Sequence, residues 1–240
     1  MTMMILTTLA AVLVTAAVAA AGDVTDTWKK RVEVNPAGAA GPVPVVVFLH
    51  GCSGPYARPE LKADTDAWAQ AVTGAGWRFV IPDSWARGVW SRPDGCRLGS
   101  VSSAQKIRAI RLEELGYAVQ RLAEDPAVDK GRIVAFAYSE GAFAVANAAL
   151  PDGVRGLIIA AWTCHQDRLP AAGGLGAPLA MPLLAIEFER DNFLSTQGRC
   201  SEFFVGRSDA REVILPGEGH VAGSVAAARA AVVEFLGGLR

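Results

Sequence analysis

Ser139 lies where an apolar run, small residues and a helical pattern meet. The segment Ala137-Tyr138-Ser139-Glu140-Gly141 joins IVAFAY, typical of a buried strand, to AFAVANAAL, typical of a helix. A tight strand-to-helix turn needs small residues at its flanks, because the neighbouring strand and helix crowd both positions. Such a turn lifts the hydroxyl above the sheet edge, next to a helix N-terminus that favours developing negative charge. We therefore interpret Ser139 as a nucleophile; the alternative is a serine that caps an ordinary helix.

A serine nucleophile needs a general base, and the chain has three histidines. His220 follows the last predicted strand, in LPGEGH. Serine hydrolases with a strand–turn–helix elbow carry their groups in the chain order serine, acid, histidine. His220 fits this order, whereas His50 comes too early, and we interpret His165 as a solvated or locally bonded side chain. The alternative for His220 is a histidine on a surface loop.

The acid is expected after the strand that precedes the last one, in the segment 189–192, which reads ERDN. We choose Asp191, with Glu189 and Glu187 as alternatives. A carboxylate at this place would hold the tautomer of His220 and stabilise the imidazolium as it forms. If Asp191 has no such role, it is a loop carboxylate paired with Arg190.

Two backbone N–H groups should complete the site as an oxyanion hole. One belongs to Glu140, directly after the serine, and we place the other at Cys52, in the loop after the first buried strand. Gly51 and Gly54 in that loop, which reads HGCSG, allow its backbone to approach a substrate closely.

The elements that must position these residues alternate between strands and helices. Apolar runs and apolar stripes predict strands over 43–49, 77–81, 132–138, 154–162, 182–188 and 211–215, with 27–36 as a candidate antiparallel edge strand, and helices over 58–74, 103–124, 140–150 and 222–238. This alternation is typical of a mostly parallel sheet with helices on both faces. In the longest helix, Leu112, Leu115, Val119 and Leu122 share the apolar face, and Arg111 is expected to point away from it.

The N-terminal segment and the net charge indicate where the protein resides and which partners it is unsuited to bind. Residues 1–21 are apolar or small and end in AVAAA, which predicts a cleaved secretory signal peptide. The alternative is an uncleaved anchor, which would be the protein's contact with a membrane. Residues 22–240 are expected to form one domain in the periplasm or outside the cell. The formal net charge of −1 and the lack of a basic run argue against nucleic acid as a partner.

The sequence resembles the dienelactone hydrolase family of the α/β-hydrolase superfamily. The segments HGCSG, PDSWARG, AYSEG, FERDNF and PGEGH carry the resemblance, which runs from about residue 43 to the C-terminus. It implies an α/β-hydrolase fold without a large cap domain. One departure concerns the nucleophile, because family members that open cyclic dienelactones use a cysteine in a G-x-C-x-G elbow. The dienelactone substrate therefore does not follow for Ser139.

The four cysteines fit two disulfides in an exported protein. Four cysteines allow three pairings, and the sequence alone does not choose among them. In the implied fold, Cys52 and Cys96 follow two neighbouring strands, and Cys164 and Cys200 follow another two. We therefore predict the bonds Cys52–Cys96 and Cys164–Cys200; the alternative is buried free thiols.

These features predict hydrolysis of a small carboxylic ester or lactone through an acyl-serine intermediate, with no metal or organic cofactor. One rival is a peptidase, amidase or acyltransferase on the same scaffold. Another is a non-catalytic binding protein with a hydrolase fold.

Overall fold

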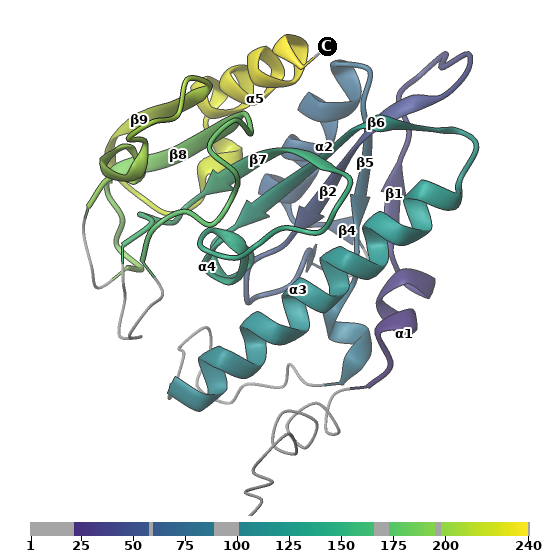
Figure 1. The fold of residues 1–240 in the computed structure, drawn as a ribbon, viewed down its shortest axis with the longest axis horizontal. Coiled ribbons are helices and arrows are strands. Elements are labelled where there is room, and N and C mark those ends of the chain that lie inside the picture. The colour runs from purple at the N-terminus through teal and green to yellow at the C-terminus, as the bar shows by residue number, and fades with distance from the viewer. Residues whose placement is uncertain (1–21, 58–59, 89–100, 166–172, 195–197, 240) are drawn as a thin grey trace, which may run out of the picture.

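Among the residues that the computed structural model describes, which are 22–57, 60–88, 101–165, 173–194 and 198–239, seven strands form one sheet in the order β1-β5-β2-β6-β7-β8-β9 (Figure 1). The strands are β1 (Val32–Val34), β2 (Val43–Leu49), β5 (Arg78–Ile81), β6 (Val128–Tyr138), β7 (Val154–Ala160), β8 (Leu183–Arg190) and β9 (Ala210–Glu218). β1 pairs antiparallel with β5 at the edge, and the other pairings are parallel. The predicted mostly parallel sheet is confirmed, and the predicted signal segment, residues 1–21, lies outside the described residues.

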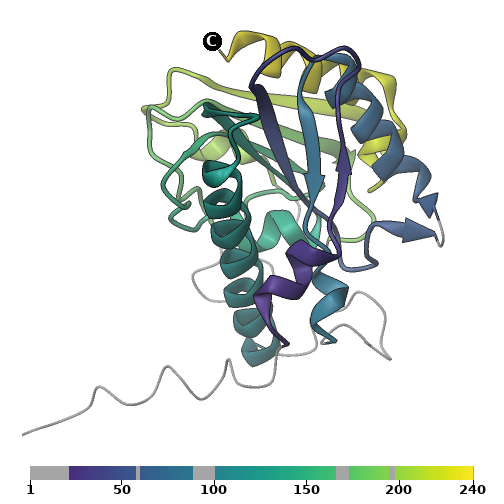
Figure 2. The same ribbon diagram turned by 90° about the vertical axis from the view of Figure 1, so that its right-hand side faces the viewer.

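Helices cover both faces of the sheet, as Figures 1 and 2 show. The helices α3 (Val101–Glu124) and α4 (Glu140–Val145) lie on one face, together with the short helix α1 (Val24–Lys29), and α2 (Ala63–Gly74) and α5 (Ala226–Gly238) lie on the other. β2 is buried along its whole length, and its side chains alternate between the two faces. Val45 and Val47 pack on the α3 side, and Val46 and Phe48 on the α2 side.

Two helix predictions and one strand prediction need correction. The predicted helix 58–74 begins only at Ala63, because Tyr56–Ala57 (β3) and Glu60–Leu61 (β4) pair as a short hairpin. The helix after Ser139 was expected to reach residue 150 but ends at Val145, where the segment 173–176 packs against residues 146–148 and Gly176 N–H donates to Ala146 O. The candidate edge strand 27–36 is confirmed only over Val32–Val34 (β1), because residues 24–29 form α1, a helix of six residues that is too short to show a helical period.

Parallel strands bring their carboxyl ends to the same edge of the sheet, where ligands of such sheets bind. His50, Ser139 and Asp191 directly follow β2, β6 and β8, and His220 comes two residues after β9. The fold therefore gathers side chains from distant parts of the sequence at one edge.

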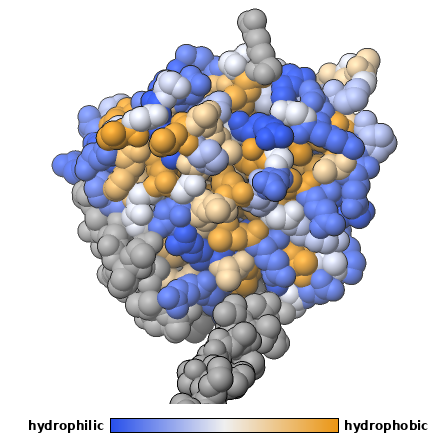
Figure 3. All heavy atoms as spheres, in the orientation of Figure 1, coloured by the Kyte–Doolittle hydropathy of each residue, from blue (hydrophilic) through white to orange (hydrophobic). Residues whose placement is uncertain are grey.

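The surface carries both polar and apolar side chains. On the face shown in Figure 3, apolar side chains gather across the centre of the molecule, among polar ones. The most exposed large apolar side chains of the described residues include Val205, Phe193 and Leu179. None of the described helices combines the length and the apolar composition that a bilayer span requires.

Candidate active site

Ser139 occupies a strained turn between β6 and α4. Its backbone has φ 54° and ψ −113°, a conformation that residues with a side chain rarely adopt. The turn is held on both sides, because Ser139 N–H donates to Ala160 O at 2.9 Å and Phe143 N–H donates to Ser139 O at 2.9 Å. Backbone strain of this kind costs on the order of 1–3 kcal/mol and concentrates at functional sites.

The small residues of the elbow are required by close packing. A Cβ on Gly141 would lie 2.8 Å from the carbonyl carbon of Leu49 and 2.9 Å from its Cβ, so only glycine fits beside the end of β2. Ala137 pairs in register with Leu49 on one side and Ile159 on the other. The crowding inferred from the sequence at both flanks of the serine is therefore present.

The structure brings Ser139, His220 and Asp191 into one hydrogen-bonded chain. His220 Nε2 lies 2.8 Å from Ser139 Oγ, and His220 Nδ1 lies 2.7 and 2.9 Å from the two carboxylate oxygens of Asp191. A carboxylate only accepts, so the Nδ1 proton faces Asp191, and Nε2 is left to accept the serine proton. Asp191 and His220 are both buried. This arrangement can deprotonate the Ser139 hydroxyl.

The loop after β8 fixes the carboxylate and covers one face of the imidazole. Asp191 Oδ1 accepts hydrogen bonds from the backbone N–H groups of Phe193 at 2.8 Å and Leu194 at 3.3 Å. The Phe193 ring stacks on His220 with 4.7 Å between ring centroids, although two thirds of Phe193 remains exposed. The Tyr138 hydroxyl donates to His220 O at 3.2 Å. The histidine is thus held by its backbone and its ring.

The two alternative acids, Glu189 and Glu187, accept hydrogen bonds from backbone groups other than His220. Glu189 is exposed and accepts from Gly217 N–H at 2.8 Å. Glu187 is buried and accepts from Cys200 N–H at 2.9 Å, and its burial raises the pKa of the carboxyl group to about 8. His165 is half-buried, lies 3.3 Å from Glu202 and contacts the ring of Phe203, so it is locally bonded as expected.

The loop after β2 lies against the elbow. A Cβ on Gly51 would meet two carbons of the Tyr138 ring at 3.2 Å and Ser139 Cβ at 3.3 Å. Glu140 is the first residue of α4 and follows the serine directly. The structure therefore places the two segments with the expected oxyanion donors, Cys52 and Glu140, beside Ser139.

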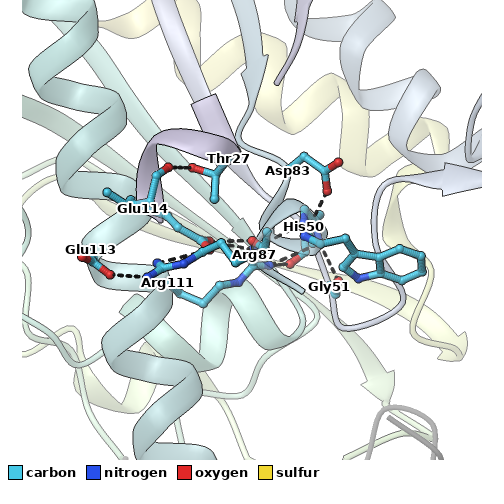
Figure 4. Close-up of polar contacts among 11 residues, drawn as sticks. Thr27, His50, Gly51, Asp83, Arg87, Arg111, Glu113 and Glu114 are labelled. Atoms are coloured by element: carbon cyan, nitrogen blue, oxygen red, sulfur yellow. Dashed lines mark hydrogen bonds and ion pairs between the residues drawn. The ribbon is translucent and has the colours of Figure 1, made fainter. Parts of the chain in front are cut away.

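The expected orientation of Arg111 is wrong. Its side chain is fully buried, together with that of Glu114 one helical turn later, and the two groups lie 3.3 Å apart. A guanidinium tolerates such burial when polar partners surround it. The partners of Arg111 include the Ser84 hydroxyl and the carbonyl of His50, which Figure 4 shows beside it. The sequence carries a usable signal, since Ile107, Arg111 and Glu114 recur at helical spacing on one stripe.

The predicted Cys164–Cys200 disulfide is present, with 4.8 Å between the two Cα atoms. It links the segment after β7 to the short helix η2 (Cys200–Phe203), which follows β8. Cys52 is also disulfide-bonded. Cys96 lies outside the described residues, so the pairing Cys52–Cys96 stays a prediction.

One group of possible metal ligands occurs among the described residues. Ligand atoms of Glu187, Cys200 and Glu212 lie within 4.8 Å of one another. The Cys200 sulfur is bonded to Cys164, and Glu212 accepts hydrogen bonds from Ser201. The group therefore lacks the thiolate that a metal site of this composition would use.

Comparison with known proteins identifies the fold. No protein-family model and no curated protein sequence matches the chain. Among solved structures, esterase PE8 has a TM-score of 0.58 at 18% identity over 87% of this chain and 98% of its own. A cold-adapted esterase from an Arctic intertidal metagenomic library has a TM-score of 0.56 at 15% identity, covering 86% of each chain. A serine hydrolase without a lid from Xanthomonas campestris has a TM-score of 0.51 at 14% identity over 87% of this chain and 85% of its own. The structural neighbours are thus esterases and serine hydrolases of the α/β class, and the chain has the α/β-hydrolase fold.

Proposed function

We propose that the protein hydrolyses a small carboxylic ester or lactone through an acyl-serine intermediate. The observation that carries the proposal is the continuous chain of hydrogen bonds from Asp191 through His220 to Ser139. The serine has a strained backbone, and the histidine and the acid are buried, as a preorganised nucleophile requires.

The first half of the reaction transfers the acyl group to the enzyme. His220 Nε2 takes the Ser139 proton while Oγ attacks the carbonyl carbon, and the carbonyl oxygen becomes an oxyanion. Asp191 stabilises the imidazolium that forms. As the tetrahedral intermediate collapses, the imidazolium gives its proton to the alkoxy oxygen, and the C–O bond breaks. For a lactone, the released alcohol stays attached to the acyl group.

The second half returns the free enzyme. His220 takes a proton from water while the water oxygen attacks the acyl carbon. As the second tetrahedral intermediate collapses, the bond between the acyl carbon and Oγ breaks, the imidazolium returns its proton to Ser139 Oγ, and the carboxylic acid leaves. The N–H groups of Cys52 and Glu140 hold the oxyanion in both halves. Each such donor contributes on the order of 3 kcal/mol of transition-state stabilisation.

The proposal includes export to the periplasm or the cell exterior. The apolar segment 1–21 supports it as a signal peptide, and the Cys164–Cys200 disulfide is typical of an oxidising compartment.

A fluorophosphonate probe tests the reaction class directly. We expect it to label the wild type and not Ser139→Ala. Ser208→Ala is the matched control, because Ser208 is an exposed serine far from the elbow in sequence. Labelling of Ser139→Ala, or none in the wild type, would contradict the proposal and favour a binding protein.

A substrate panel then tests the bond. The wild type should hydrolyse p-nitrophenyl esters of graded acyl length and simple lactones, and leave aminoacyl p-nitroanilides intact. Faster turnover of the anilides would indicate a peptidase or amidase instead.

A further inference from the structure

A buried ionic cluster around Arg111 and Glu114 contacts the start of the loop that follows β2 (Figure 4). Arg111 and Glu114 of α3 are fully buried, and the Ser84 hydroxyl contacts both, donating to Glu114 Oε2 at 2.5 Å. Arg87 is a third buried charge, and its Nη1 lies 3.9 Å from Glu114 Oε1. Burying such charges costs several kcal/mol in desolvation, and apolar residues of the same volume often stabilise a fold as well or better. Stability alone is therefore a poor reason for this cluster.

The cluster is connected to the loop backbone. Arg111 donates to the carbonyl oxygen of His50, and His50 Nδ1 lies 2.7 Å from the carbonyl oxygen of Gly51. A carbonyl only accepts, so Nδ1 carries a proton and donates it. Burial and the charge of Arg111 hold the pKa of His50 well below its usual value, so the ring is neutral. Its Nε2 is then left as an acceptor, 3.4 Å from Arg111 Nη1.

The direction of one carbonyl determines the direction of the next N–H. The Gly51 carbonyl and the Cys52 N–H belong to the same peptide unit, which is planar, and in a trans peptide they point in opposite directions. The hydrogen bond from His50 to Gly51 O therefore aims the Cys52 N–H. The hydrogen bond from Arg111 to His50 O fixes the preceding peptide unit, and with it the imidazole that holds Gly51.

We propose, on the basis of the proposed function, that Arg111 is a positioning residue for ester hydrolysis: supported by Glu114 and acting through His50, it aims the Cys52 N–H at the oxyanion. The residue does not touch the substrate. Its contribution is to transition-state binding, because the oxyanion is absent from the ground-state ester.

Arg111→Lys tests this role, because an ammonium keeps the charge and lacks the planar fork that reaches Ser84 and His50 O together. Losing an oxyanion donor outright costs about 100- to 1000-fold in kcat, so a misdirected one should cost about 10- to 100-fold, with KM changed less than about twofold. The inhibition constant of phenylboronic acid, whose tetrahedral serine adduct places an oxygen in the oxyanion hole, should rise by a similar factor. Arg121→Lys is the matched control, an exposed arginine on the same helix that pairs with Glu124.

The outcomes separate this role from a structural one and from the proposed function. If Arg111→Lys keeps the wild-type kcat, or if its kcat falls while phenylboronic acid binds as in the wild type, the positioning role is overturned. Ser84→Ala removes one partner of Arg111 at little change in volume, and it should show the same pattern at smaller amplitude even where Arg111→Lys fails to fold. A wild type that neither hydrolyses esters nor binds the boronate would instead overturn the proposed function itself.

Discussion

Gly141→Ala tests whether the elbow depends on the close approach of two backbones. The new Cβ would lie 2.8 Å from the carbonyl carbon of Leu49 and closer still to its oxygen, where ordinary contact begins near 3.4 Å. The obstacle is backbone in a buried strand, so it cannot turn aside as a flexible side chain would. The end of β2 and the start of α4 must therefore separate by about 1 Å, as in other overpacked cores.

This displacement has two measurable consequences. Overpacking should lower the free energy of unfolding by about 1–3 kcal/mol, measured by denaturant titration. Leu49 directly precedes the loop with Cys52, so the same shift moves the oxyanion donor relative to Ser139. A misplacement of about 1 Å costs roughly 100-fold in rate, so kcat for p-nitrophenyl acetate should fall by that factor.

Gly116→Ala is the control for the same chemical change. Gly116 lies inside α3, and a Cβ there would meet only Pro151 Cγ, at 3.8 Å. Alanine in a helix interior should raise stability by roughly 0.5–1 kcal/mol and leave kcat unchanged. If Gly141→Ala is as stable and as active as Gly116→Ala, the argument from close packing is refuted.

Three further predictions concern the acid, a buried carboxyl group and the disulfide. Asp191→Asn should lower kcat about 10,000-fold at neutral pH, because the amide no longer selects the tautomer of His220; a loss under tenfold would contradict the assigned acid. The folded-state pKa of Glu187 is raised from 4.5 to about 8. The folded protein therefore keeps this proton to a higher pH than the unfolded chain does. The free energy of unfolding should thus fall as pH rises from about 4.5 to 8. Glu187→Gln should remove this fall and, above pH 8, exceed the wild type by a few kcal/mol in urea unfolding; parallel stability curves from pH 5 to 9 would contradict the shift. Replacing Cys164 and Cys200 by alanine opens a loop of 36 residues and should lower the free energy of unfolding by about 4 kcal/mol; an unchanged denaturation midpoint would show that the bond adds no stability.

The sequence predicts the parallel strands of this fold well, because their signals are local. β2 has its predicted bounds, since a continuous apolar run is closed by Gly41-Pro42 and Gly51. The elbow is likewise readable, because small residues and two different periods meet at Ser139. The order of the later strands then points to Asp191 and His220, which the structure brings together.

What the sequence did not reveal depends on contacts between distant segments. The early end of α4 follows from the segment 173–176, which packs on residues 146–148 just after the helix, and no pattern near Val145 indicates this contact. Arg111 was misassigned because a charged residue on an amphipathic helix usually faces solvent. Its burial is possible only because Ser84 and the His50 carbonyl meet it from two other elements.

The separation of the serine and the histidine also bears on how the protein acquires activity. Ser139 and His220 are 81 residues apart, and β7 and β8 must pair between them before the two side chains meet. Contacts so distant along the chain slow folding, because the entropy of loop closure must be lost before they can form. A refolding chain should therefore regain hydrolytic activity only once the sheet is complete. The recovery of turnover during refolding thus reports when the sheet has formed.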